Sequence, residues 1–75
     1  MAYSGEERKI LREFCRRVRV ARKACGWTQE DLASEVGVDR TYIGGVERGE
    51  RNLGLLNINR IAVALDEDFE GFLPR

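Results

Sequence analysis

The segment that decides the fold runs from Thr28 to Gly49 and reads TQEDLASEVGVDRTYIGGVERG. Thr28 is a favourable N-cap, and the acidic residues of the turn after it suit the positive end of a helix dipole. Gly37 is a natural end for this short helix, while Asp39 and Gly49 offer the start and the end of another. The pattern therefore predicts two short helices that meet across a three-residue turn beginning with glycine.

The second of these helices has two distinct faces. With Ile43, Val46 and Glu47 inward, the helical period turns five other residues away from the domain. These residues are Arg40, Thr41, Gly44, Gly45 and Arg48. Each glycine on an exposed helix face costs about 1 kcal/mol relative to alanine. Either the glycines are tolerated, or their missing side chains let another molecule approach the backbone closely. An arginine, a threonine and a flat glycine surface together suit the base edges of a DNA major groove.

A long helix is predicted before this segment. The capping box Ser4-x-x-Glu7 opens the helix, and Gly26 is its expected end. Apolar residues recur along it at spacings of three and four, as one inward stripe. They are Leu11, Phe14, Val18, Ala21 and Cys25. The opposite face is basic.

Two more helices are predicted after the central segment. One covers about residues 55–65, with Leu55, Ile58, Ala62 and Leu65 at helical spacing. A last short helix runs from residue 68 to residue 73, and Pro74 stops it. No period-two alternation or hairpin turn signals a strand. The chain is therefore predicted to be a single all-α domain over residues 1–75, with five helices in an orthogonal bundle.

Size and composition indicate a globular protein that gains from a partner. The chain has 75 residues, of which 43% are apolar and 35% charged. A chain this short buries only about 60% of the surface that its unfolded form exposes, so its core is thin. No apolar run approaches the roughly 18 residues that a membrane span needs, and the N-terminus lacks a signal pattern, so a cytoplasmic protein is expected.

Metal, cofactor and enzyme chemistry are not expected. The sequence has no histidine, and its two cysteines fall in one predicted helix. Cys15 and Cys25 would lie about 15 Å apart there, whereas a disulfide needs Cα atoms within about 7 Å. There is also no glycine-rich phosphate loop and no nucleophile elbow.

Charge is unevenly distributed along the chain. The net charge is zero, which by itself argues against a nucleic-acid partner. However, the segment from Arg8 to Ala24 carries a local balance of +7, while residues 66–70 carry four acids and no base. Segments of opposite sign suggest opposite faces, although a basic stripe is more often a solvated helix face than a binding site.

From about Val18 to Leu65 the chain resembles the helix-turn-helix family of the phage lambda and 434 repressors and Cro, the XRE family. The matching stretches are Thr28–Ala33, Val36-Gly37-Val38, Tyr42-Ile43, Val46–Gly49 and Arg51-Asn52. The resemblance implies a five-helix, lambda-repressor-like DNA-binding domain with its motif at about residues 28–48. Residues 39–48 are also similar to the recognition helix of controller proteins of restriction-modification systems, which are dimers of about this length.

This resemblance implies a role in base reading for three residues. Arg40 and Thr41 would read bases, since arginine matches guanine and the threonine methyl matches thymine. Arg51, in the loop after the recognition helix, would hold the DNA backbone or reach a neighbouring base. Relatives often carry longer side chains where this chain has its two glycines, so specificity would fall more heavily on Arg40.

The resemblance also implies contacts with the DNA backbone, which set register rather than sequence. The start of the first motif helix would meet phosphate, and other residues would border the groove or allow close approach. The expected set is Thr28, Gln29, Tyr42, Gly44, Gly45, Arg48 and Asn52. The family further suggests a partly buried ion pair between Arg22 and Glu47 that orients the recognition helix.

The C-terminal part, about residues 55–73, is the predicted dimer interface. Its apolar side chains exceed what a thin core needs at its end, and the expected contact residues are Val63, Phe69, Phe72 and Leu73. The function expected is sequence-specific transcription regulation by a homodimer on a palindromic operator, with an autoregulatory restriction-modification controller as the narrower form. Double-stranded DNA, a second copy and RNA polymerase are the candidate partners. The alternative is an antitoxin or adaptor module that uses this fold for protein interaction.

Overall fold

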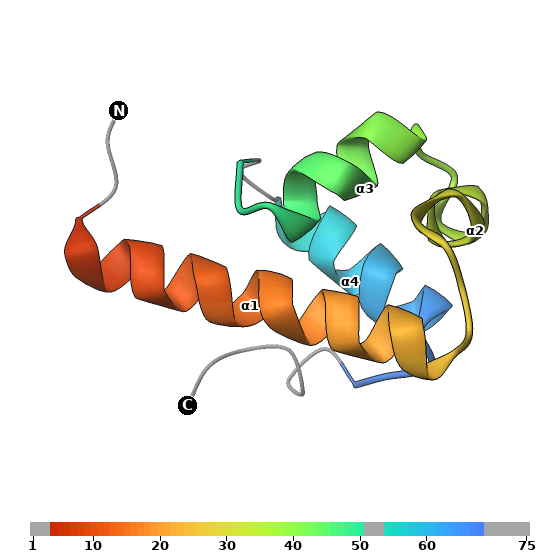
Figure 1. The fold of residues 1–75 in the computed structure, drawn as a ribbon, viewed down its shortest axis with the longest axis horizontal. Coiled ribbons are helices and arrows are strands. Elements are labelled where there is room, and N and C mark those ends of the chain that lie inside the picture. The colour runs from red at the N-terminus through yellow and green to blue at the C-terminus, as the bar shows by residue number, and fades with distance from the viewer. Residues whose placement is uncertain (1–3, 51–53, 69–75) are drawn as a thin grey trace.

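The computed structural model describes residues 4–50 and 54–68. It contains α1 (Gly5–Ala24), α2 (Gln29–Val36), α3 (Arg40–Glu47) and α4 (Leu55–Ala64), and no strand occurs in these two stretches (Figure 1). The all-helical prediction is confirmed, but the described chain has four helices rather than five. The expected fifth helix lies outside the described residues except for Asp68, which is not helical.

The predicted helix starts are confirmed by their hydrogen bonds. Ser4 Oγ accepts the Glu7 N–H at 3.1 Å, and Glu7 Oε1 accepts the Ser4 N–H at 2.9 Å. Thr28 and Asp31 form the same reciprocal box at the start of α2, with distances of 3.1 and 2.8 Å. Each box satisfies two backbone donors that would otherwise lack partners, so helix entry is fixed locally.

A tight turn links α2 to α3. Gly37 ends α2 with φ at +85°, a left-handed conformation that glycine adopts without steric cost. Asp39 then caps α3, because its Oδ1 accepts the Thr41 N–H at 2.9 Å. Three residues therefore separate the two helices, as the sequence predicts.

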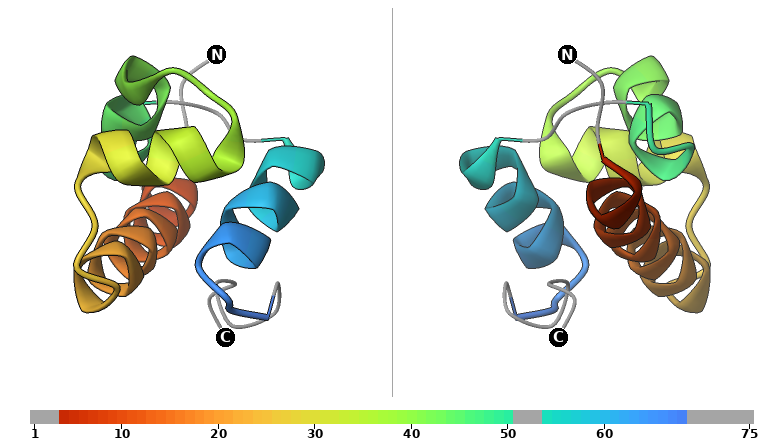
Figure 2. Two further views of the ribbon diagram at one scale, coloured as in Figure 1. Left: turned by 90° about the vertical axis from the view of Figure 1, so that its right-hand side faces the viewer. Right: turned by 90° about the vertical axis from the view of Figure 1, so that its left-hand side faces the viewer.

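The helices enclose one small core. Helix α2 packs against α3 and α4, and α1 packs against α3. Figure 2 shows α1 and α4 running on either side below α2, with α3 above. Every helix contributes to the buried apolar set, which is completed by the turn after α4. This set is Phe14, Cys15, Val18, Leu32, Ala33, Ile43, Val46, Ile61, Ala62 and Leu65.

Two residues of the apolar patterns noted in the sequence, Cys25 and Leu55, are exposed. Cys25 is the C-cap of α1, and its side chain lies beyond the last turn that packs on the core. Leu55 is 72% exposed at the first position of α4. Helical side chains lean toward the N-terminus of their helix, so Leu55 projects past the end of α4 rather than onto the core. Periodicity groups these two residues with core positions, but it does not show where a helix ends relative to its neighbours.

The two cysteines are free and sit in different surroundings. Cys15 is buried in the core, and this burial raises the pKa of its thiol. Cys25 is exposed. Of the helices in the described ranges, none combines the length and apolar character needed to cross a bilayer.

Candidate nucleic-acid interface

The first turn of α3 presents a free cation beside a hydroxyl group. Arg40 and Thr41 are both exposed, directly after the Asp39 cap. Within the described residues, no hydrogen bond or salt bridge holds the Arg40 guanidinium. The Thr41 N–H donates to Asp39 and lowers the pKa of that carboxyl, so the cap is ionised at neutral pH. The Asp39 cap thus fixes the backbone of this turn, while the side chains of Arg40 and Thr41 face solvent.

The polar side chains at the start of α2 already have partners within the protein. Thr28 Oγ1 accepts the Asp31 N–H, and the Asp31 carboxylate accepts the Thr28 N–H, which lowers the pKa of Asp31. A carboxylate therefore already lies at this positive helix end. The half-buried Gln29 turns toward α3, where its Nε2 donates to Glu47 Oε1 at 3.3 Å.

Arg22 and Glu47 are brought together in the interior. Arg22 Nε lies 2.6 Å from Glu47 Oε2, and Arg22 Nη2 lies 3.0 Å from Oε1. The residues are 8% and 3% exposed, so this is a desolvated, bidentate pair. Hydrogen bonding to Glu47 raises the pKa of Arg22. Arg22 Nη1 also donates to the Trp27 carbonyl at 2.7 Å, which ties in the loop before α2.

Arg19 belongs to the same network, although it was not among the residues expected at the site. Its Nη2 donates to the Glu47 carbonyl oxygen at 2.8 Å, at the negative end of the α3 dipole. Arg19 lies three residues before Arg22, so both project from one side of α1. This spacing is the signal that could have identified it.

The expected flat glycine surface on α3 is wrong. Gly44 and Gly45 are both buried. The position of a Cβ on Gly44 would lie 3.1 Å from Arg48 Nη1 and 3.5 Å from Gln29 Oε1. Two long polar side chains thus cover Gly44. At Gly45, the turn after α3 folds back, and the Glu50 N–H donates to the Gly45 carbonyl at 2.9 Å.

Two further contacts at α3 were not expected. Asn57 Nδ2 of α4 donates to the Tyr42 hydroxyl at 3.1 Å, which links the second motif helix to α4. Arg48 Nε lies 3.1 Å from Glu50 Oε2, and both side chains are more than half exposed. No sequence pattern pointed to Asn57, whereas opposite charges two residues apart could have suggested Glu50.

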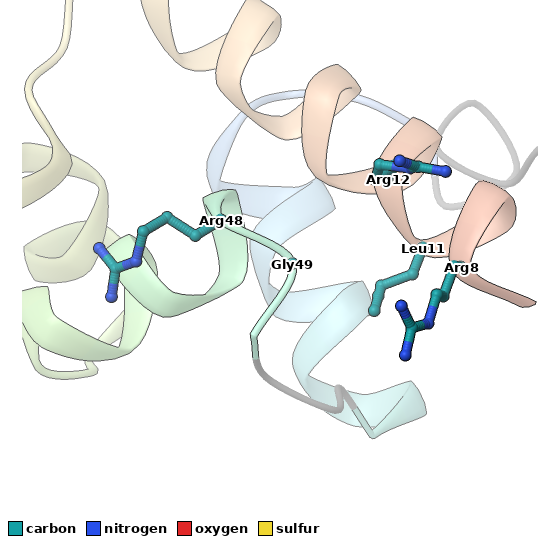
Figure 3. A pocket seen from close by; sticks show the side chains of 5 residues that line it. All are labelled: Arg8, Leu11, Arg12, Arg48 and Gly49. Atoms are coloured by element: carbon teal, nitrogen blue, oxygen red, sulfur yellow. The ribbon is translucent and has the colours of Figure 1, made fainter. Parts of the chain in front are cut away.

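An open basic hollow of about 330 Å³ lies between the first half of α1 and the end of α3. Its lining residues are Arg8, Leu11, Arg12, Arg48 and Gly49. In Figure 3 the Arg48 side chain points away from Arg8 and Arg12, so the three guanidinium groups do not converge. The hollow extends the basic surface beside α3 rather than forming a compact anion site.

Several predicted site residues lie outside the described residues: Arg51, Asn52, Phe69, Phe72 and Leu73. Val63, the remaining member of the predicted dimer set, is 70% exposed on α4.

In this structure a short turn joins α2 and α3, the first turn of α3 is exposed, and Glu47 anchors its last turn. This is the arrangement of a helix-turn-helix motif. The helix-turn-helix family model matches residues 18–72. The chain belongs to this family. The restriction-modification controller protein C.AhdI from Aeromonas hydrophila has a similar solved structure, with a TM-score of 0.81 and 48% identity over 84% of this chain and 96% of that one. The controller C.Esp1396I, solved as a tetramer with its natural 35 base-pair operator, has a TM-score of 0.78 and 36% identity over 84% of this chain and 83% of that one.

A curated relative, a hypothetical transcription factor of Neisseria meningitidis serogroup B, is 40% identical over 60 residues. The match covers 80% of this chain and 57% of that relative, so the chain spans little more than half of the relative's length.

Proposed function

We propose that this helix-turn-helix protein binds a specific operator sequence in double-stranded DNA as a homodimer and thereby regulates transcription. The observation that carries the proposal is the first turn of α3, where Arg40 and Thr41 are exposed while Glu47 is held on Arg22. A rigidly mounted helix start can place these two side chains on base edges in a major groove. Rigid mounting matters because a loosely held site would lose the geometry that discriminates bases.

Base reading is assigned to Arg40 and Thr41, with Arg51 as a further reader. Contacts with the DNA backbone are assigned to Gln29 and Arg48, whose side chains both lie close to Gly44. Thr28, Tyr42 and Asn52 stay predicted backbone contacts. Arg8 and Arg12 add positive charge beside the end of α3. Such basic residues favour phosphate without adding sequence information.

The homodimer is assigned to the outer face of α4. Leu55, Leu56 and Val63 are 72%, 63% and 70% exposed, although all three are large and apolar. An open hollow beside Val63, lined by residues of α2 and α4, makes this face concave at one point, where a side chain of a second copy could fit. Burial of such a surface against a second copy would extend the thin core. Phe69, Phe72 and Leu73 stay predicted members of the interface.

The relatives support a narrower role. Two solved relatives are restriction-modification controller proteins, and one of them was solved on its operator. We therefore assign this chain the role of a controller of this type, without enzymatic activity. A contact with RNA polymerase stays a prediction, to be checked by co-sedimentation with the polymerase on operator DNA.

Selection of bound sequences from a random duplex pool tests the proposal. A dimer should enrich a palindrome whose half-sites lie about 34 Å, or one helical turn, apart. Enrichment of a motif without two-fold symmetry would contradict the dimeric mode of reading. A pool with no enriched motif would contradict sequence-specific binding itself.

A further inference from the structure

Gly44 is buried even though the helical period places it on the outward side of α3, because Arg48 lies over it. Arg48 is one helical turn further along, and its side chain reaches back toward the start of the helix. Its Nη1 and Cζ lie 3.1 and 3.9 Å from the position that a Cβ on Gly44 would take. Figure 3 shows the same side chain directed away from Arg8 and Arg12. The guanidinium thus occupies the space that a side chain at position 44 would fill.

The guanidinium over Gly44 has an exposed acidic partner, Glu50. Glu50 Oε2 lies 3.1 Å from Arg48 Nε. The side chains of Arg48 and Glu50 are 57% and 60% exposed, so their partnership is open to exchange with other anions. Glu47, by contrast, is buried and bonded to Arg22. A guanidinium binds carboxylate and phosphate through the same planar set of donors.

We propose that Gly44 is a positioning residue that seats Arg48 for a DNA backbone phosphate, and that the Glu50 carboxylate holds the place of this phosphate in the free protein. The inference rests on the proposed DNA-binding function. It assigns Gly44 a role other than close approach of the DNA to the helix backbone. It also makes Glu50 an internal competitor, since phosphate must displace the carboxylate or share Arg48 with it.

The experiment is a set of titrations with the selected operator duplex and a scrambled duplex of equal length, at several salt concentrations. Arg48→Ala should weaken binding to both duplexes and reduce the salt slope by about one. Glu50→Gln should tighten binding to both by about two- to fivefold, the range of an exposed ion pair. This gain should vanish in the Arg48→Ala background. Glu6→Gln, at an exposed acid in the first turn of α1, removes the same charge elsewhere and should leave affinity unchanged.

Gly44 is tested in the same way. Gly44→Leu places an apolar group where Arg48 lies, so it should weaken binding about as much as Arg48→Ala. The double variant Gly44→Leu with Arg48→Ala should lose little more than either single variant. Thermal melts of each variant identify any that fail to fold. If the Gly44 variants do not fold, Glu50→Gln in the original and Arg48→Ala backgrounds tests the inference by itself.

Three results would overturn the inference: weaker binding by Glu50→Gln, a gain that persists without Arg48, or additive losses from Gly44→Leu and Arg48→Ala. The last would mean that position 44 meets the DNA directly. These results leave the proposed function standing if the original chain prefers the operator duplex. Failure of the original chain to bind any selected duplex would instead contradict the proposed function.

Discussion

Arg22 of α1 holds Glu47 of α3 through two parallel hydrogen bonds of 2.6 and 3.0 Å, in a place where each residue is less than one-tenth exposed. The pair joins the longest helix to the last turn of the second motif helix. Glu47 also accepts from Gln29, and Arg22 donates to the Trp27 carbonyl. One buried contact therefore fixes α3 relative to α1, the loop before α2, and α2 itself.

Separating this pair should destabilise the fold more than replacing it. Arg22→Met or Glu47→Leu alone leaves a buried charge without its partner and should cost about 3–5 kcal/mol of unfolding free energy. The double replacement should cost less than the sum, because no unpaired charge remains. Chemical denaturation of the four proteins measures the coupling. Arg16→Met, which breaks an exposed contact with Glu13, is the matched control and should change little. Additive losses would show that the two residues act independently.

Acid should weaken the helix starts. Hydrogen bonds from backbone N–H groups lower the pKa of Glu7 from its usual 4.5, and of Asp31 and Asp39 from their usual 3.8. A lowered folded-state pKa contributes stability above the unfolded value, and this stability is lost as pH falls through the folded value. We expect the melting temperature to drop as pH falls below about 4.5 and to keep dropping below about 3.8. Calorimetry across pH 7 to 2 checks this.

Asp39→Asn provides the control for the acid effect. Asparagine keeps an acceptor for the Thr41 N–H but does not titrate. Its melting temperature should therefore depend less on pH in the acid range than that of the original chain. Equal acid dependence in both proteins would remove Asp39 from the explanation.

The exposed face of α4 should control assembly. Val63→Glu places a charge on a side chain that is 70% exposed, so the subunit should still fold while its apolar contact is lost. Sedimentation at tens of micromolar should show a dimer for the original chain and a monomer for the variant. Val20→Glu, on an exposed site of α1, should remain dimeric. A monomeric original chain, with or without DNA, would refute the interface.

The helix ends could be predicted from sequence because they depend on neighbouring residues. Ser4 with Glu7 and Thr28 with Asp31 each form their capping bonds within three residues. Gly37 ends α2 through its own backbone conformation. These features need no knowledge of the rest of the chain, so the order and bounds of the first four helices followed from the sequence.

The exposed surface of α3 could not be predicted in the same way, because it depends on the conformations of long side chains that lie over it. The helical period correctly separates Ile43 from Arg40, yet it also places Gly44 in the open. The burial of Gly44 arises from the Arg48 side chain and from Gln29 of another helix. Likewise, the bond from Asn57 to Tyr42 joins residues that only the packing of α4 brings together. Contacts between distant elements carry no local signal in the sequence.

The most direct test of the account is the effect of Arg40→Ala on sequence preference. Arg40 leads α3 and is exposed, and an arginine paired with guanine discriminates by about 1–3 kcal/mol. Titrations of the selected operator and a scrambled duplex should show operator affinity reduced by this amount, with affinity for the scrambled duplex nearly unchanged. Arg48→Ala, at the side chain assigned to a backbone phosphate, should lower both affinities and serves as the comparison. Equal weakening of both duplexes by Arg40→Ala would make Arg40 a backbone contact and contradict its role as the reading residue.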